Sequence, residues 1–172
     1  MVSLAPVPIL SYLEFTPSVG EDVTLAPRAF VVGKVRIAGP AVLADSAVLR
    51  GDQNWINVAS RCVIGQRSTI HVELDRSTDV GQDVWIGDDA VVHACTLGDG
   101  VRVEDGGLVL SNSRVGAGSI VDADALVPEG VEFPDNSFIS GTPGRRLRDT
   151  TPEERAETRQ RIADAYSRVS RA

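Results

Sequence analysis

The 172-residue sequence is poor in cysteine and in basic residues. It has only two cysteines, Cys62 and Cys95, which are too few for a disulfide framework, so a reducing compartment, the cytoplasm, is expected. Its 17 Lys and Arg residues face 24 Asp and Glu residues, for a formal net charge of −7. That balance argues against a nucleic-acid or anionic-membrane partner, because both require clustered cations.

Long apolar runs are also missing. No stretch approaches the ~18 consecutive apolar residues of a membrane-spanning helix. The segment from Met1 to Leu13 is partly apolar but lacks the cationic start of a secretory signal. Hydrophobic residues still make up 42% of the chain, which is enough for one packed core.

What the sequence does contain is a six-residue period. Twenty positions between Val19 and Ile139 follow it, and all twenty are apolar. The spacing is interrupted by three extra residues (55–57), by four extra residues (76–79) and by one hexad that is a residue short, between Val92 and Leu97. The full set is Val19, Leu25, Val31, Ile37, Leu43, Leu49, Val58, Ile64, Ile70, Val80, Ile86, Val92, Leu97, Val103, Val109, Val115, Val121, Val127, Phe133 and Ile139.

A period of six is typical of a narrow solenoid. Each hexad supplies one flat strand and one turn, and three hexads close a triangular coil whose bore holds the large aliphatic side chain. One coil cannot bury its own core, so the coils must stack. The sequence therefore predicts an all-β fold, a left-handed parallel β-helix, which is an exception to the right-handed crossover rule. Twenty hexads make nearly seven coils.

The pattern divides the chain into three parts. Residues 1–18 form an N-terminal leading segment or edge strand, residues 19–144 form the β-helix, and residues 145–172 form a C-terminal helix packed on the solenoid. Thr151 as N-cap, Pro152 at the first helical position and Glu154 as its capping-box partner predict the helix start. Its predicted apolar face consists of Ala156, Ile162, Ala163, Tyr166 and Val169.

The repeat also predicts where the two histidines lie. Leu49, Ile70 and Val92 begin hexads on the same corner of three successive coils, so the residues that follow them, Arg50, His71 and His93, form one column. Neighbouring coils are ~4.8 Å apart, so the two imidazoles can share one metal ion. Asp88, Asp89 and Glu73 are the candidate third ligands, and two histidines with one carboxylate suit zinc or ferrous iron.

These segments resemble the γ-class carbonic anhydrase family of hexapeptide-repeat proteins, from about Val19 to Tyr166. The resemblance is carried by Leu49-Arg50-Gly51-Asp52, by Ile70-His71-Val72, by the run from Val84 to Cys95 and by Gly141-Thr142-Pro143-Gly144.

The resemblance implies a homotrimer with a zinc site at each subunit interface, iron and cobalt being the alternative metals. His71 and His93 match two family ligands on one subunit, and the position of the third histidine, supplied by the neighbour, is Asp88 here. Arg50 and Asp52 match a pair that bridges subunits beside the metal. We expect Arg50 to bind an anionic group of a small-molecule substrate, Asp52 to hold Arg50, and Glu73 to transfer protons.

The family's Asn and Gln before the first histidine are Val63 and Gly65 in this chain. That Gln ordinarily orients metal-bound solvent, so the departures imply a weak carbonic anhydrase or a related hydratase or hydrolase. The alternatives are a thioester hydrolase, a cyclase or isomerase of a specialised pathway, and a non-catalytic assembly subunit. A hexapeptide acyltransferase usually needs one catalytic histidine and a long excursion loop, whereas the insertions here are three and four residues long.

Overall fold

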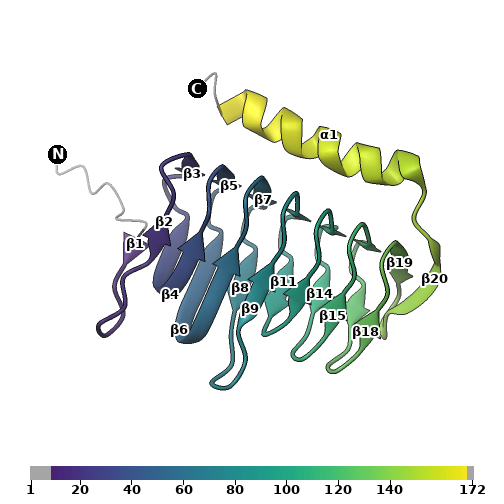
Figure 1. Cartoon of the computed structure of the whole chain (residues 1–172), viewed down its shortest axis with the longest axis horizontal. Coiled ribbons are helices and arrows are strands. Elements are labelled where there is room, and N and C mark those ends of the chain that lie inside the picture. Colours follow the sequence, from purple (N-terminus) through teal and green to yellow (C-terminus); the bar gives the residue numbers. More distant parts are fainter. Residues whose placement is uncertain (1–8, 170–172) are drawn as a thin grey trace.

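The computed structural model describes residues 9–169 and shows a left-handed parallel β-helix of hexapeptide repeats with one C-terminal helix, as the six-residue period predicts (Figure 1). Of the predicted leading segment, residues 1–8 lie outside the described residues. The coils form three flat faces, and each strand pairs in parallel with its counterparts in the coils before and after it.

Faces one and two belong to a single 12-stranded sheet, because two long strands bend around the corner between them. These are β4 (Phe30–Ile37) and β6 (Val48–Val58). Face one is completed by β1 (Ile9–Leu10), β8 (Thr69–His71), β11 (Val91–His93), β14 (Leu108–Val109) and β17 (Leu126–Val127). Face two is completed by β2 (Ser18–Val19), β9 (Thr78–Val80), β12 (Thr96–Leu97), β15 (Arg114–Val115) and β18 (Glu132–Phe133).

Face three is a separate 8-stranded sheet. It consists of β3 (Val23–Leu25), β5 (Ala41–Leu43), β7 (Cys62–Ile64), β10 (Trp85–Ile86), β13 (Arg102–Val103), β16 (Ile120–Val121), β19 (Ser137–Ser140) and β20 (Arg145–Asp149). The last strand, β20, runs antiparallel to β19 and so differs from every other paired strand described. The sequence did not predict β20, because its five exposed residues carry no apolar alternation.

The twenty periodic positions fill the bore, as predicted. All of them are buried except Val19 and Leu25, which are partly buried and pack against the same core. Removing a large aliphatic side chain from water contributes roughly 1.5–3 kcal/mol, so the stacked column is the main source of stability. The consequence for function is that consecutive coils are held in register, which fixes the rows of side chains outside.

Helix α1 (Pro152–Val169) covers face three (Figure 1). The capping box is confirmed, because the Glu154 backbone N–H donates to Thr151 Oγ1 at 3.2 Å and the Thr151 N–H donates to Glu154 Oε2 at 2.8 Å. The docked face is made by Thr158, Ile162, Ala165, Tyr166 and Val169.

The predicted helix face was therefore right at Ile162, Tyr166 and Val169 and wrong at Ala156 and Ala163, which are exposed. The helix does not have the length and apolar character needed to cross a membrane.

Ion pairs fix the helix to the sheet. Arg102 on β13 lies 3.1 Å from Glu104 and 3.2 Å from Glu157 on the helix, and Arg161 lies 2.9 Å from Glu104 and 2.7 Å from Glu157. At the start of the helix, both terminal nitrogens of Arg148 donate to the Glu154 carboxylate at 2.8 and 2.7 Å.

The pair of Arg148 and Glu154 makes stability depend on pH. The hydrogen bond from Arg148 lowers the pKa of Glu154 to about 2, from an ordinary value of 4.5. Because the pKa is lower in the folded state, the stabilisation is complete above about pH 4.5 and is lost as the pH falls towards 2. We expect Glu154→Gln to lower the unfolding free energy by about 1 kcal/mol at pH 7, allowing for surface screening, and the two proteins to converge near pH 2.

Urea unfolding at a series of pH values measures this difference. Glu132→Gln is the matched control, since Glu132 makes no ion pair within the described part of the chain. A difference between wild type and Glu154→Gln that stays constant with pH would contradict the assignment.

Candidate metal site

The two histidines stack on the corner between faces one and two. Their backbones are register partners in adjacent strands, and Arg50 is the register partner of His71 in the coil below. The ring centroids are 5.2 Å apart and the ring planes differ by 27°. The predicted column of Arg50, His71 and His93 is therefore present.

His71 has two partners that compete for one nitrogen. Its Nε2 lies 2.9 Å from Nη2 of Arg50 and 3.0 Å from Oδ1 of Asp52, and Arg50 Nε lies 3.3 Å from Asp52 Oδ2. A guanidinium can only donate and a carboxylate can only accept, so a neutral Nε2 satisfies one of them and not both. The Nε2 atom therefore bonds one of these groups at a time, while Arg50 and Asp52 also pair with each other.

The Asp52 carboxylate is held ionised by this arrangement. Partial burial raises its pKa, but the hydrogen bond with His71 and the charge of Arg50 together outweigh burial, so the pKa is lowered from its ordinary value. Asp52 therefore pairs with Arg50 beside His71 within one chain, and the bridge between subunits that the resemblance implies for this pair stays a prediction.

His93 faces a second carboxylate. Its Nε2 lies 3.4 Å from Oε1 of Glu73, and the buried Ser111 hydroxyl donates to the same oxygen at 2.6 Å. The hydrogen bond from Ser111 is the main reason that the pKa of Glu73 is lowered, with burial opposing and a positive charge on His93 assisting. Each imidazole thus has a carboxylate within reach of its Nε2.

Asp88 lies on a different corner, between faces three and one. It lies in the turn before β11, whereas His93 ends β11, so the three-residue strand and part of the turn, roughly 10 Å of strand alone, separate the two in one chain. Asp88 Oδ1 accepts a hydrogen bond from the backbone N–H of Gln66, one coil below, at 2.7 Å.

The bond from Gln66 to Asp88 is one of four of the same kind. Asp105 accepts from the Asp88 N–H at 2.9 Å, Asp99 from the Gln82 N–H at 2.8 Å and Asp135 from the Ala117 N–H at 2.8 Å. Asp88 is therefore a turn cap in the single chain, and its Oδ2 is the oxygen left for a ligand.

Asp89, another candidate ligand, is occupied elsewhere. Its carboxylate accepts two hydrogen bonds from Arg67, at 2.8 and 2.7 Å, and these bonds are the main reason that the pKa of Asp89 is lowered. Asp89 shares the turn of Asp88 and does not face the histidines of its own chain.

The donor set fits a metal ion in part. Two imidazoles with carboxylates nearby match the ligands of zinc and of ferrous iron. Within residues 9–169, however, no group of three or more His, Cys, Asp or Glu side chains comes together closely enough to hold a metal. A metal site built on the two histidines would therefore need a ligand from outside the described residues of one chain.

The two cysteines are structural. Both are free and buried, and burial raises the pKa of each thiol to about 12. Cys95 follows the His93 turn but packs in the core.

The two tryptophans, Trp55 and Trp85, both have packing roles. Trp85 packs beneath α1. Trp55 lies edge-on to Phe15 and beneath the Arg36 guanidinium.

The sequence did not predict that Glu73 and Arg76 contact residues two coils above them. Ser111 binds Glu73, and Nη1 of Arg76 donates to Oδ1 of Asn112 at 2.6 Å. The repeat register gives the coil on which Ser111 and Asn112 lie, but the path of an inserted loop does not follow the repeat. No sequence signal therefore linked residues 73–76 to residues 111–112.

No protein-family model matches the sequence, but similar proteins and structures are found. The chain is 32% identical over 170 residues to "Gamma carbonic anhydrase 1, mitochondrial" of Arabidopsis thaliana, a match that covers 95% of this chain and 62% of that protein. It is 28% identical over 155 residues to Protein YrdA of Escherichia coli, covering 86% of this chain and 84% of that protein. The chain thus spans less than two thirds of the plant relatives' length.

One solved structure is similar over nearly its whole length. A hexapeptide transferase family protein from Anaplasma phagocytophilum superposes with a TM-score of 0.88 at 30% sequence identity, covering 93% of this chain and 96% of that one. This chain therefore shares its fold with the Anaplasma phagocytophilum protein and about 30% of its residues with each of these relatives.

The capping role of Asp88 can be tested apart from any ligand role. Asp88→Asn keeps an oxygen that accepts from Gln66, whereas Asp88→Ala leaves that N–H without its acceptor. We expect Asp88→Ala to lower the unfolding free energy by about 1 kcal/mol and Asp88→Asn to lie close to wild type. Urea unfolding measures both.

Asp99→Ala serves as the control, because Asp99 caps Gln82 in the same way and should cost a similar amount. Equal losses for Asp88→Asn and Asp88→Ala would show that the charge of Asp88, and not its capping bond, stabilises the turn.

Proposed function

The chain belongs to the γ-class carbonic anhydrase-like family of hexapeptide-repeat proteins, and on that basis we propose that it is a metal-dependent enzyme acting on water or a carbonyl group of a small substrate. The observation that carries the proposal is the pair of stacked imidazoles, whose Nε2 atoms face Asp52, Glu73 and Arg50. Zinc is the proposed metal, with iron and cobalt as alternatives.

The complete site requires a homotrimer in this proposal. The two half-sites lie at opposite edges of face one, His93 where β11 ends and Asp88 just before it begins. A contact between unlike edges is heterologous, so it either closes a ring or extends a filament. A solenoid of triangular cross-section suits a closed ring of three, in which Asp88 of one subunit meets His71 and His93 of the next.

The outer surface of face one supports this arrangement. Five of the six residues in its outward column are apolar, and nothing in the described chain covers them: Phe30, Val48, Thr69, Val91, Leu108 and Leu126. The matching column of face two is polar: Arg36, Asn57, Asp79, Thr96, Arg114 and Glu132. Face three is covered by α1. Face one is thus the face suited to bury against another copy.

Each residue then has a role. His71 and His93 of one subunit, with Oδ2 of the neighbour's Asp88, would hold the metal, which when bound supplies Lewis acidity towards water or a carbonyl oxygen. Arg50 binds an anionic group of the substrate, and Asp52 holds the guanidinium in place. Glu73 accepts and returns a proton at its carboxylate, 3.4 Å from His93.

Carbon dioxide hydration is proposed to be weak. At Gly65, where the family has a Gln, an added Cβ would lie 2.5 Å from the carbonyl carbon of Gly87, so the coils leave no room for a side chain. Val63, where the family has an Asn, is buried beneath α1. A small carbonyl compound or thioester carrying an anionic group is therefore a better proposed substrate than CO2.

The free, buried state of Cys62 and Cys95 is consistent with the proposed cytoplasmic location.

Metal binding is the first test of the proposal. We expect one Zn²⁺ or Co²⁺ per chain after reconstitution, and a fall in affinity of at least about 100-fold in His71→Ala and in His93→Ala, because each removes a direct ligand. Elemental analysis and isothermal titration calorimetry measure the two quantities.

Arg61→Gln is the control, since Arg61 pairs with Asp83 at the corner between faces two and three, which carries neither the histidines nor Asp88. Stopped-flow CO2 hydration and a panel of small thioesters, run on the loaded protein, then separate the two kinds of substrate. A protein that takes up neither Zn²⁺, Co²⁺ nor Fe²⁺ would contradict the proposal.

The trimer is tested separately. Leu108→Glu places a charge in the apolar column of face one, so it should convert a trimer into monomers, whereas Thr96→Glu on face two should leave the trimer intact. Sedimentation velocity at micromolar concentration measures the assembly. A wild-type monomer, or a trimer that survives Leu108→Glu, would show that face one is not the interface.

A further inference from the structure

Glu73 belongs to a short loop, residues 72–77, that projects from the histidine corner. Its backbone forms a tight turn, in which the Glu73 N–H donates to the Arg76 carbonyl at 3.1 Å and the Arg76 N–H donates to the Glu73 carbonyl at 3.3 Å. Leu74 lies at the tip and is 79% exposed. The tip therefore has no apolar packing to hold it, so polar contacts must fix its position.

The contacts that hold the 72–77 loop come from other coils. One coil below, Asn54 Nδ2 donates to the Leu74 carbonyl at 3.2 Å. Two coils above, Ser111 binds the Glu73 side chain, and Asn112 binds the Arg76 guanidinium at 2.6 Å. The loop therefore passes over the coil of His93 and Ala94, where the Asn112 N–H donates to the Ala94 carbonyl at 2.8 Å.

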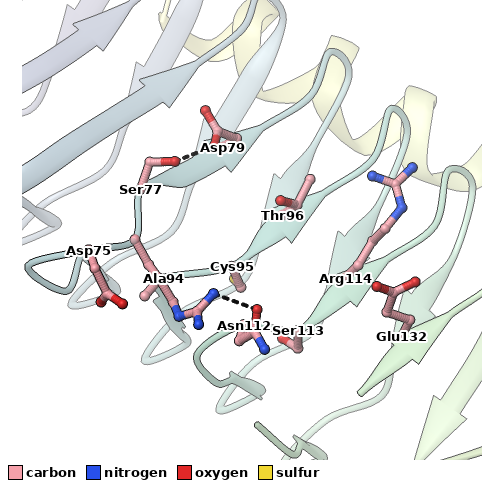
Figure 2. A pocket seen from close by; sticks show the side chains of 11 residues that line it. Asp75, Ser77, Asp79, Ala94, Cys95, Thr96, Asn112, Ser113, Arg114 and Glu132 are labelled. Carbon is pink, nitrogen blue, oxygen red and sulfur yellow. Dashed lines mark hydrogen bonds between the residues drawn. The ribbon is translucent and has the colours of Figure 1, made fainter. Parts of the chain in front are cut away.

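Figure 2 shows the hydrogen bond from Arg76 to Asn112 as the dashed line that ends at Asn112. It crosses a polar pocket of about 340 Å³ lined by Asp75, Ala94, Cys95 and Asn112 among others (Figure 2).

We propose that the hydrogen bond between Arg76 and Asn112, here called the loop latch, positions Glu73 for proton transfer. Arg76 and Asn112 are therefore positioning residues. This inference rests on the proposed function of Glu73. Ser111 attaches the loop through Glu73 and Asn54 attaches its tip, but neither contact holds the Arg76 side of the turn. The loop latch attaches that side. With both sides of the turn attached, Glu73 Oε1 is held between Ser111 Oγ and His93 Nε2.

Asn112 is suited to this position for a second reason. Its φ of 57° lies in the left-handed region, which Asn and Asp enter more readily than other residues with a side chain. Replacing it with Ala would strain the turn and confuse the result, whereas Gly accepts the same φ and removes only the side chain.

The test compares three variants. Asn112→Gly removes the loop latch, Asn112→Asp keeps an oxygen that accepts from Arg76, and Asn136→Gly is the matched control at a turn position with the same φ of 57°. The readout is hydrogen–deuterium exchange at the amides of Glu73 and Arg76. We expect about 10-fold faster exchange in Asn112→Gly, the equivalent of one lost hydrogen bond, with recovery in Asn112→Asp and no change in Asn136→Gly.

Imidazole NMR signals provide an independent readout, because the chain has only two histidines. In Asn112→Gly the ring signals of His93 should shift, whereas those of His71, which contacts Arg50 and Asp52, should not. Neither readout depends on turnover or on a bound metal.

The results separate this inference from the proposed function. Unchanged exchange in Asn112→Gly, or faster exchange that Asn112→Asp does not restore, would overturn the loop latch even in an active enzyme. Faster exchange with a displaced His93 signal supports it. If the loop is released in this way and turnover of the loaded enzyme is unaffected, the proton-transfer role of Glu73, and with it the positioning role, is wrong.

Discussion

The structure depends on the parallel register between coils. Because each buried aliphatic position pairs with its equivalent in the next coil, as Ile70 does with Val92, the outward-facing strand residues are also stacked on their equivalents. Side chains in such a column are one strand spacing apart, ~4.8 Å. Polar groups that would be isolated on another fold are therefore brought into contact here, and their chemistry is a property of the column.

The same register produces two different polar columns. On one corner it stacks two imidazoles and a guanidinium, which leaves His71 Nε2 with more partners than a neutral ring can satisfy. On the next corner it places carboxylates above backbone N–H groups of the preceding coil, so that Asp88 and Asp105 cap the turns below them. The first column is the one proposed to bind a ligand, whereas the second is satisfied within the chain and stabilises the fold.

Features that follow the repeat were predictable from the sequence, and features that depart from it were not. The bore positions and the stack of His71 on His93 required only the spacing of apolar residues, and both were right. The helix start was right because its capping box is local. The helix face was wrong at Ala156 and Ala163, because the rotation of a helix about its axis is set by the surface it meets.

The contacts of the 72–77 loop could not be predicted, since inserted residues have no register. Only the part of the candidate site that lies within one chain could be predicted from the sequence. The sequence brought Arg50, His71 and His93 together, but the capping bond of Asp88 depends on which coil lies below its turn. Whether Asp88 also meets the histidines depends on a second chain.

The capping bond of Asp88 has a consequence for anyone who would redesign this protein. In the proposed trimer, exchanging Asp88 for a histidine would supply a third imidazole and, in the same step, remove an acceptor from the Gln66 amide. The proposed ligand chemistry and the stability of the scaffold would thus be coupled at one side chain, and neither could be tuned there without altering the other. A compensating acceptor at the Gln66 turn would have to accompany the exchange.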